Sequence, residues 1–449
     1  MAWLLAIFLI PYLGIFFFLL IGSYRLPKKR LAKQVAIDAV ITERMTGVET
    51  HTDESKWPSW LPGIVEMDRA LTAIPAVAGN SATLFDDYKA GVDAMAAEID
   101  TATTFVHVEF YIVSFDETTR GFFGAMKRAV ARGVTVRVLA DHVASVRAAN
   151  AKRTFAELDR IGVKWSFMLP FQPFKGNFQR PDLRNHRKLV VVDGRVAFMG
   201  SQNLIDRTYN SKKNLKRGLK WQELITRVTG PAVTAINTIF IGDWYCETDE
   251  RIDSENVPFA EVASTGDLDM QLVPSGPGYA YENNLRLFLG LLHSAQEKVI
   301  ITSPYFVPDE SMLYAITSAR QRGLEVQLFV SEIGDQAGVF HAQRSYYGEL
   351  LRAGVRIFMY PGPYILHAKH VSIDDDVAVI GSSNMDIRSF NLDLEISLLV
   401  HGASFVNDMR KVEQHYRDIG RELTLEEWDK EPARRTFWDG LARLTSALQ

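Results

Sequence analysis

A pattern of histidine, lysine and aspartate that occurs twice constrains the fold of this chain more than any other feature. The two copies of His-x-Lys-x4-Asp consist of His186, Lys188 and Asp193, and of His367, Lys369 and Asp374. In each copy a glycine lies 14 residues after the histidine and opens a Gly-Ser-x-Asn cluster, which ends at Asn203 or Asn384. Chance is a poor explanation, because the chain has only ten histidines in 449 residues. The duplication predicts two similar units, each carrying one half of a site.

A strand, helix and strand plan also occurs twice. The apolar run at 105–113 precedes a helical stretch and then the strand-like run VTVRVLAD, while the run at 299–307 precedes a helical stretch and then LEVQLFVS. This order of elements predicts α/β layers with largely parallel strand pairing. We therefore expect two similar α/β domains, at 65–255 and at 256–449, the second of which includes a C-terminal helix.

The first 22 residues contain no charged side chain. In a helix at about 1.5 Å per residue they would extend roughly 30 Å, the thickness of the bilayer hydrocarbon core. No Lys or Arg precedes this run and no A-x-A site follows it, which argues against a cleaved signal peptide. Basic residues that follow predict a cytoplasmic location for the rest of the chain; they are Arg25, Lys28, Lys29, Arg30 and Lys33. We expect a single-pass anchor at 1–24 in the cell membrane and a basic, polar connector at 25–64.

Composition limits the partners and the kind of site. Hydrophobic residues make up 47% of the chain and charged residues 23%, which suits a folded enzyme. The formal net charge of −4 provides no overall attraction to nucleic acid, so no nucleic-acid partner is expected. The single cysteine, Cys246, excludes an intrachain disulfide framework and a multi-cysteine metal site. An anionic substrate must therefore be held by local basic groups.

Strand periodicity separates the motif residues by role. His186 and Lys188 are two positions apart, so they face the same side of an extended segment. Asp193 is an odd number of positions from His186 and begins the Asp193-Gly194 pair, a strong hairpin signal between two apolar runs. The second copy repeats this geometry, with Asp374 before VAVIG. Both aspartates belong to the candidate catalytic motif, but we interpret them as structural residues of the turns.

The repeated histidine, lysine and asparagine suit the chemistry of a phosphate. Lysine supplies positive charge, asparagine supplies a neutral donor, and imidazole can attack phosphorus or transfer a proton. One histidine cannot easily act as nucleophile and as leaving-group acid in the same step, whereas two histidines from facing half-sites can divide these roles. Two lysines and two asparagines can neutralise the developing charge, so neither a metal ion nor a cofactor is expected.

These motifs resemble those of the phospholipase D superfamily and, within it, the bacterial cardiolipin synthases. The superfamily pattern H-x-K-x4-D-x6-G-S/G-x-N stands at 186–203 and 367–384, and the subfamily similarity rests on longer strings such as SGPGYAYE, TSPYFVPDE and GSSNMDIRSF. The resemblance covers nearly the whole chain. It implies two phospholipase D-like α/β/α sandwich domains, related by pseudo-twofold symmetry and preceded by an N-terminal transmembrane helix. Related synthases commonly have two N-terminal spans, and the segment here resembles the second.

The resemblance also implies a reaction and its residues. One histidine attacks the lipid phosphorus and forms a phosphohistidine, while the other protonates the departing glycerol and then deprotonates the incoming hydroxyl. By similarity, His186 is the nucleophile and His367 the general acid/base, although the symmetry of the two motifs leaves the opposite assignment open. Two phosphatidylglycerol molecules would give cardiolipin and glycerol. The residues that would hold the phosphate oxygens are Lys188, Lys369, Asn203 and Asn384.

Family members place a carboxylate behind each histidine to orient it. Glu395 matches this position in the second half of the chain, and Glu223 is its counterpart in the first half. The expected partners are phosphatidylglycerol, other anionic phospholipids and the membrane, and no oligomeric state is predicted. Three alternatives stay open: a lipid hydrolase that releases phosphatidic acid, a nuclease of the same superfamily, and an inactive membrane-bound scaffold. The anchor and the negative net charge count against the nuclease, and the two intact motifs count against the scaffold.

Overall fold

The computed structural model describes residues 2–22, 26–45, 52–171, 180–252 and 262–444. Five helical segments precede the sheet: α1 (Ala2–Leu9), α2 (Pro11–Ile21), α3 (Lys28–Met45), η1 (Glu54–Lys56) and α4 (Leu61–Thr72). The first half of the sheet region contains β1 (Val77–Phe85), α5 (Tyr88–Asp100), β2 (Phe105–Phe110), α6 (Arg120–Ala131), β3 (Thr135–Asp141), α7 (His142–Arg147), α8 (Ala151–Ile161), β4 (Lys164–Met168), β5 (Arg184–Asn185), β6 (Leu189–Val192), β7 (Val196–Gly200), α9 (Lys212–Arg217), β8 (Lys220–Gln222), β9 (Ile225–Thr229) and α10 (Ala232–Thr248).

The second half repeats this series with additions at its end. It contains β10 (Leu268–Ser275), α11 (Asn283–Ser294), β11 (Lys298–Thr302), β12 (Phe306–Val307), α12 (Glu310–Gln321), β13 (Glu325–Ser331), α13 (Ala337–Arg344), α14 (Tyr347–Arg352), β14 (Arg356–Tyr360), β15 (Tyr364–Leu366), β16 (His370–Ile373), β17 (Val377–Gly381), β18 (Met385–Asp386), α15 (Ile387–Asn391), β19 (Asp393–His401), α16 (Ala403–Ile419), β20 (Arg421–Leu423), α17 (Leu425–Trp428) and α18 (Ala433–Arg443).

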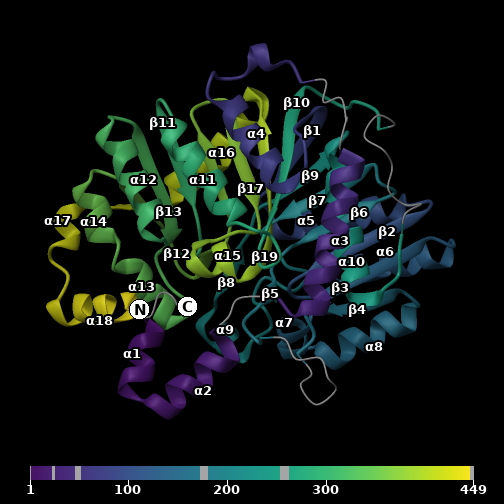
Figure 1. Ribbon diagram of the computed structural model, residues 1–449, viewed down its shortest axis with the longest axis horizontal. Helices are drawn as coiled ribbons and strands as arrows, with labels where there is room; N and C mark the ends of the chain where they lie inside the picture. The colour runs from purple at the N-terminus through teal and green to yellow at the C-terminus, as the bar shows by residue number, and fades with distance from the viewer. Residues whose placement is uncertain (1, 23–25, 46–51, 172–179, 253–261, 445–449) are drawn as a thin grey trace.

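One sheet runs through both halves, and its strand order is the same in each when read outward from the centre (Figure 1). The central pair is β1 with β10, in antiparallel register. Outward from β1 the order is β9, β7, β6, β2, β3 and β4. Outward from β10 the order is β19, β17, β16, β11, β13 and β14, and β20 adds an edge strand. Each first-half strand in this continuous order therefore has a counterpart in the second half, and the α/β class expected from the sequence is confirmed.

Parallel pairing is less extensive than the sequence predicted. In the first half it joins β2, β3 and β4, and in the second half it joins β11, β13 and β14. The strands nearer the centre pair antiparallel, because the short β6–β7 and β16–β17 turns can only reverse the chain. Parallel strands need a long crossover, and helices such as α6 and α12 provide it on the outer part of each half.

Side chains of successive strand residues enter cores on opposite faces of the sheet. In β2, Phe105 lies in the core that contains residues of α10 and α16, whereas Val106 and Val108 lie in the core beneath α5 and α6. In β11, Ile300 faces the first of these cores and Ile301 faces a third core beneath α11 and α12. Apolar residues therefore occupy both alternating positions of these strands. Helices cover both faces of the sheet, as is usual for parallel strands.

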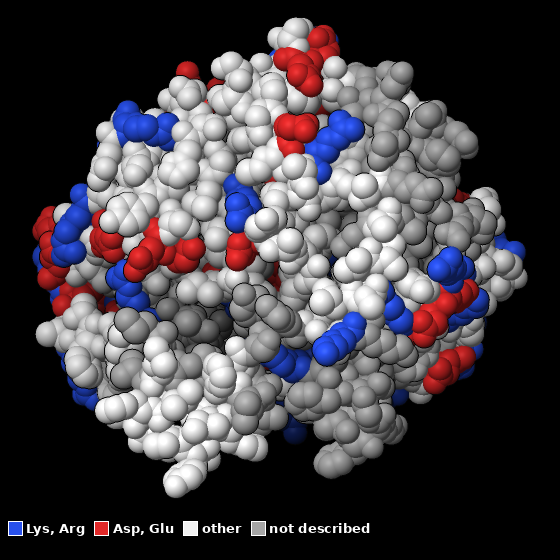
Figure 2. All heavy atoms as spheres, in the orientation of Figure 1, with Lys and Arg blue, Asp and Glu red and all other residues white. Residues whose placement is uncertain are grey.

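The N-terminal apolar segment differs from the single continuous helix predicted for it. It forms α1 and α2, which are separated at Ile10, where φ is −137° and ψ is 72°. Pro11 explains the break, because its ring disfavours helical geometry at the preceding residue and it has no amide hydrogen to donate. In Figure 2 the described atoms of α1 and α2 are white, because this segment contains no Lys, Arg, Asp or Glu. Across the described ranges, no helix combines the length and apolar character needed to cross a membrane.

The predicted connector at 25–64 contains the 18-residue helix α3, which packs along α10 (Figure 1). Ile37 and Ile41 are four residues apart and so lie on one face of α3, against the core that includes α10. Arg30 forms a buried ion pair with Glu247 of α10. The amphipathic pattern of α3 was not used in the sequence analysis. Residues 46–51 of the connector and the predicted domain boundary at 255/256 lie outside the described residues.

Candidate active site

Two very short strands exchange partners between the halves and position both histidines. β5, which immediately precedes His186, pairs in parallel with β19 of the second half. β15, which precedes His367, pairs in parallel with β8 of the first half. The exchange continues to the histidines themselves: the amide of His186 donates to the carbonyl of Leu394 at 2.9 Å, and the amide of His367 donates to the carbonyl of Gln222 at 2.7 Å. Each histidine is thus fixed by backbone of the opposite half.

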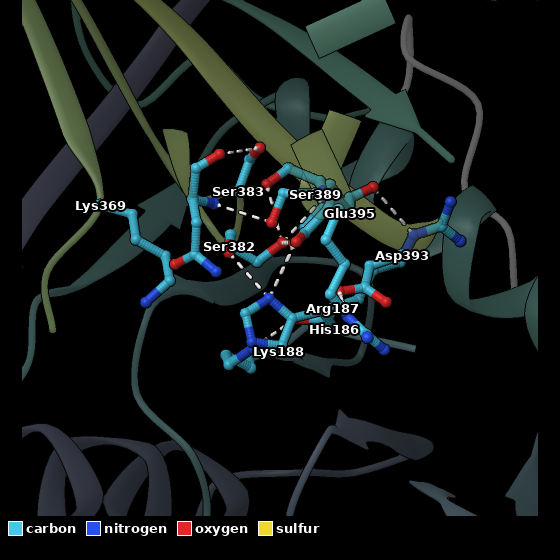
Figure 3. A network of polar contacts seen from close by, with 12 residues as sticks. His186, Arg187, Lys188, Lys369, Ser382, Ser383, Ser389, Asp393 and Glu395 are labelled. Atoms are coloured by element: carbon cyan, nitrogen blue, oxygen red, sulfur yellow. Dashed lines mark hydrogen bonds and ion pairs between the residues drawn. The ribbon is translucent and has the colours of Figure 1, made fainter. Parts of the chain in front are cut away.

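Each histidine also contacts a glutamate from the opposite half. Nδ1 of His186 lies 2.9 Å from Oε1 of Glu395, and this contact is one of the dashed lines in Figure 3. Nδ1 of His367 lies 2.9 Å from both carboxylate oxygens of Glu223. Both glutamates are the residues singled out in the sequence. Their crossed pairing was not predicted, because the exchange of β5 and β15 cannot be inferred from either motif alone.

The surroundings of His186 determine which ring nitrogen carries its proton. Nδ1 also lies 3.0 Å from the backbone carbonyl oxygen of Ser382, an atom that can only accept a hydrogen bond. Nδ1 is therefore the protonated nitrogen, and it donates to the carbonyl and to Glu395. The lone pair of the neutral ring is left on Nε2. Ser382 further donates its hydroxyl to Glu395 and so fixes the carboxylate.

Burial and nearby positive charge keep His186 neutral. Burial is the main cause that lowers its pKa well below the ordinary value, and Lys188 and Lys369 lower it further. Burial also lowers the pKa of His367, but the charge of Glu223 opposes that shift. Burial raises the pKa of Glu395 to about 7, with Lys188 acting in the opposite direction. His186 is accordingly the weaker base of the two histidines.

Both motif lysines are buried beside the histidines. Nζ of Lys188 donates to the backbone carbonyl of His186, and Nζ of Lys369 donates to that of His367 at 2.7 Å. Burial lowers the pKa of Lys188 to about 8, an effect that Glu395 and Glu223 partly offset. Burial lowers the pKa of Lys369 to about 7, again with Glu223 in opposition. An anion placed between the lysines would compensate for this loss of hydration and favour their charged forms.

The two asparagines follow the equivalent strands β7 and β17, each three residues after the last residue of its strand. Nδ2 of Asn203 donates to the hydroxyl of Tyr209 at 2.8 Å, and its Oδ1 accepts from the amide of Ile112 at 3.2 Å. Asn384 is also buried, and its Oδ1 has no hydrogen-bond partner among the described residues. Both asparagines line the same pocket as the histidines.

The pocket lies where the two halves meet and has a volume of about 490 Å³. His186 and His367 both line it, so the two half-sites share one cavity. Further lining residues include Tyr111, Arg147, Tyr209, Asn214, Trp221, Tyr305, Asp335, Gln336, Asp386, Arg388 and Asp393. Within the described part of the chain, no cluster of three or more His, Cys, Asp or Glu side chains is arranged to hold a metal ion.

Asp193 and Asp374 are held at the hairpin turns and do not line the pocket. Both have positive φ angles, 51° and 48°, in the β6–β7 and β16–β17 turns. The carboxylate of Asp193 accepts from the amides of Thr103, Thr104 and Phe105, and that of Asp374 accepts from the amides of Gln296, Glu297 and Lys298. The predicted position at the turns is confirmed, and their inclusion with the catalytic residues is corrected: each fixes its turn to the start of a neighbouring strand.

Two tyrosines of the site were missed in the sequence analysis. Tyr111 contacts the ring of His186 edge-on at 5.1 Å between centroids, and Tyr305 contacts His367 in the same way at 6.0 Å. They follow the equivalent strands β2 and β11. Their matching places in the two repeats were a signal that could have identified them.

Comparison with known proteins finds relatives over nearly the whole chain. The family described as "Cardiolipin synthase, PLD-like domain" matches residues 95–241 and 288–416, which contain both motifs. The cardiolipin synthase A of Pectobacterium carotovorum subsp. carotovorum is 30% identical over 443 residues, covering 96% of this chain and 89% of that protein. The cardiolipin synthase A of Proteus mirabilis is 29% identical over 455 residues, covering 100% and 92%.

Solved structures show the same fold at low sequence identity. The phosphatidylserine synthase of Haemophilus influenzae Rd KW20 superposes with a TM-score of 0.64 at 15% identity, over 86% of this chain and 99% of that one. A polyphosphate kinase from Porphyromonas gingivalis superposes with a TM-score of 0.50 at 12% identity, over 87% and 56%. The family match over both halves and the relative of 30% identity establish that the chain belongs to the phospholipase D-like family of cardiolipin synthases.

Proposed function

We propose that this protein is a cardiolipin synthase that transfers a phosphatidyl group from one phosphatidylglycerol to another, giving cardiolipin and glycerol. The observation that carries the proposal is the shared pocket, in which two buried histidines, each held by a carboxylate of the opposite half, face one cavity. The pocket offers a place for one phosphoryl group, with two lysines beside it. The family match and the cardiolipin synthase A relatives support the choice of this reaction within the superfamily.

In the first step, Nε2 of His186 attacks the phosphorus of the donor lipid. The bond from phosphorus to the glycerol oxygen breaks, and His367 gives its proton to that oxygen. The products of this step are a phosphatidyl-histidine and free glycerol. Lys188, Lys369, Asn203 and Asn384 stabilise the charge that develops on the phosphoryl oxygens.

In the second step, a hydroxyl of the acceptor phosphatidylglycerol takes the place of the departed glycerol. The neutral His367 accepts the proton of that hydroxyl. The hydroxyl oxygen attacks phosphorus while the bond between phosphorus and His186 breaks. Cardiolipin forms, and both histidines return to their starting states. Neither step needs a redox partner or a nucleotide.

The surroundings of the two rings support His186 as the nucleophile. Attack needs a neutral imidazole with a lone pair aimed at the substrate, and the carbonyl of Ser382 fixes this tautomer in His186. Protonation of the leaving glycerol needs an imidazolium. Burial lowers the pKa of His367, but the charge of Glu223 opposes this shift, and the pKa of His367 falls less far than that of His186. We accordingly assign the proton-transfer role to His367.

The proposal includes the organisation of the chain around the site. The two halves, 65–255 and 256–449, are domains related by a pseudo-twofold axis, and their repeated strand order supports this division. The apolar N-terminal segment attaches the protein to the cell membrane, where its lipid substrates lie. Exposed apolar side chains on α1 and α2, such as Phe8 and Tyr12, support that attachment. Basic residues after the segment favour a cytoplasmic position for both domains.

A product assay tests the proposed reaction against its main alternative. Detergent-purified protein is incubated with phosphatidylglycerol without added metal, and cardiolipin, glycerol and phosphatidic acid are quantified. We expect cardiolipin and glycerol in equal amounts. Phosphatidic acid without cardiolipin would identify a lipid hydrolase and contradict the proposal.

A further inference from the structure

The pocket wall differs on its two sides, although the histidines and their glutamates correspond. Asp393 and Trp221 occupy equivalent positions, each two residues before the glutamate that contacts a histidine. Asp393, together with Arg388, makes the wall near His186 charged. Trp221 and Tyr209 make the wall on the other side aromatic, with their ring centroids 4.6 Å apart.

A polar cluster completes the wall near His367. The hydroxyl of Tyr305 donates to Oδ2 of Asp335 at 3.0 Å, and Nε2 of Gln336 lies 3.5 Å from the same hydroxyl. Burial, followed by the charge of Asp335, raises the pKa of Tyr305 well above its ordinary value, so the phenol keeps its proton. All three residues line the pocket, and the ring of Tyr305 contacts His367.

The loop that carries Asp335 and Gln336 is held in place by the opposite half. It connects β13 with α13 in the second half. From α9 in the first half, Arg217 donates to the carbonyl of Gly334 at 2.8 Å, and Nζ of Lys213 lies 3.4 Å from the carbonyl of Asp335. The corresponding loop after β3 leads into α7, which ends with Arg147 at the pocket. At these two corresponding places the second half supplies a carboxylate and an amide to the pocket, whereas the first half supplies a guanidinium.

The reaction requires the alcohol to lie on the His367 side. Attacking and leaving groups at phosphorus are roughly in line, so the glycerol that departs from His186-bound phosphorus lies opposite His186. The proton donor for that glycerol is His367. The acceptor hydroxyl enters at the same place in the second step, because that step is the reverse of the first with a different alcohol.

We propose that Asp335, Gln336 and Trp221 form a polyol site, which binds the glycerol headgroup of the leaving and acceptor lipids and excludes water as acceptor. This inference rests on the proposed function. Asp335 accepts hydrogen bonds from glycerol hydroxyls, Gln336 can donate and accept, and the face of Trp221 covers the carbon chain. Among the described residues, Oδ1 of Asp335 has no hydrogen-bond partner and is available for a hydroxyl.

The reverse reaction measures glycerol binding directly. Full-length protein in detergent is given cardiolipin and increasing glycerol, and the phosphatidylglycerol and phosphatidic acid formed are quantified. The variants are Asp335→Asn and Gln336→Ala. Because each loses a hydrogen bond to the alcohol, we expect the KM for glycerol to rise about tenfold in Asp335→Asn, and less in Gln336→Ala. Hydrolysis of cardiolipin yields one phosphatidic acid and one phosphatidylglycerol, whereas transfer to glycerol yields two phosphatidylglycerols. At fixed glycerol, the ratio of hydrolysis to transfer calculated from these products should rise by a similar factor.

Glu332→Gln serves as the matched control, because Glu332 lies in the same loop but pairs with Arg421 at 2.9 Å and does not line the pocket. Its product ratio should equal that of the wild type. An unchanged KM for glycerol in both pocket variants would overturn the polyol site. An equal fall in both products, with their ratio unchanged, would also overturn the polyol site. That result is expected if the residues only stabilise the fold and do not bind the alcohol. Failure of the proposed function is separate: the wild-type protein would then interconvert no phosphatidylglycerol and cardiolipin.

Discussion

Nδ1 of His186 lies 2.9 Å from Oε1 of Glu395, although the two residues belong to opposite halves of the chain. The equivalent contact between His367 and Glu223 has the same length and crosses in the other direction. Neither half therefore contains a complete histidine and carboxylate pair. Each pair forms only when the two halves are packed together, so the proposed chemistry depends on the interface between them.

Replacing the glutamate behind the nucleophile should slow transfer without unfolding the protein. Glu395→Gln keeps the shape of the side chain but removes the charge that orients His186 and stabilises it once it bears the phosphoryl group. We expect kcat to fall at least about a hundredfold, by analogy with other histidine and acid pairs. Cardiolipin formation and the thermal midpoint are the measurements. A rate within threefold of the wild type would contradict the orienting role.

Removing either histidine should abolish transfer. His186→Ala lacks the nucleophile and His367→Ala lacks the proton donor, so each should lose at least about a thousandfold in cardiolipin formation. His293→Ala is a suitable control, since His293 is exposed and lies outside the pocket. Near-normal turnover in either active-site variant would show that the two half-sites do not act as one.

Activity should decline as pH rises because the phosphate site loses charge. Burial lowers the pKa of Lys188 to about 8 and of Lys369 to about 7, so the empty site becomes less positive above neutral pH. kcat/KM, which reports the free enzyme, should fall as pH increases from 7 to 9. Bound phosphate favours the charged lysines, so the corresponding fall in kcat should occur at higher pH. Identical profiles for kcat and kcat/KM would contradict this effect of the substrate.

Replacing a motif aspartate should lower the free energy of unfolding rather than remove a group that takes part in the reaction. Burial would raise the pKa of Asp193, but hydrogen bonds from Phe105, Thr104 and Thr103 outweigh it and lower the pKa below its ordinary value. In Asp193→Asn an amide would face these backbone donors, at a cost of about 1–3 kcal/mol in the free energy of unfolding. Thermal or urea unfolding measures that loss.

The pH dependence of this loss has a definite sign. A carboxylate with a lowered pKa stabilises the fold above its unfolded pKa of about 4, and the contribution disappears as pH falls through the folded value. The difference between the wild type and Asp193→Asn should therefore be full at pH 7 and shrink in acid. Asp375→Asn is the control, because its side chain is 77% exposed. A constant difference down to pH 2 would contradict the assignment.

Local patterns predicted what local geometry determines. The Asp193-Gly194 pair between two apolar runs was enough to place the aspartate at a turn, and the repeated strand plan predicted α/β halves with matching strands. The family expected from the motifs is confirmed by the comparisons. These inferences succeeded because two-residue periodicity and a duplicated motif do not depend on distant parts of the chain.

Contacts between the halves could not be predicted in this way. The crossed histidine and glutamate pairs depend on β5 and β15, which are two and three residues long and have no distinctive pattern. Asp335 reaches the pocket because α9 of the other half holds its loop. The break in the N-terminal helix was not predicted, because the length and lack of charge of the segment do not show that Ile10 leaves helical geometry before Pro11. In each case the deciding contact or conformation lies outside the motif considered.

The most direct test of the account is to locate the phosphatidyl group on the enzyme. Wild-type protein is mixed with phosphatidylglycerol labelled at phosphorus and quenched rapidly in alkaline denaturant, since phosphohistidine is unstable in acid. The labelled peptide is then mapped. Label is expected on His186 in the wild type, and no label is expected in His186→Ala. Label on His367, or on no histidine during active turnover, would contradict the division of roles between the two halves.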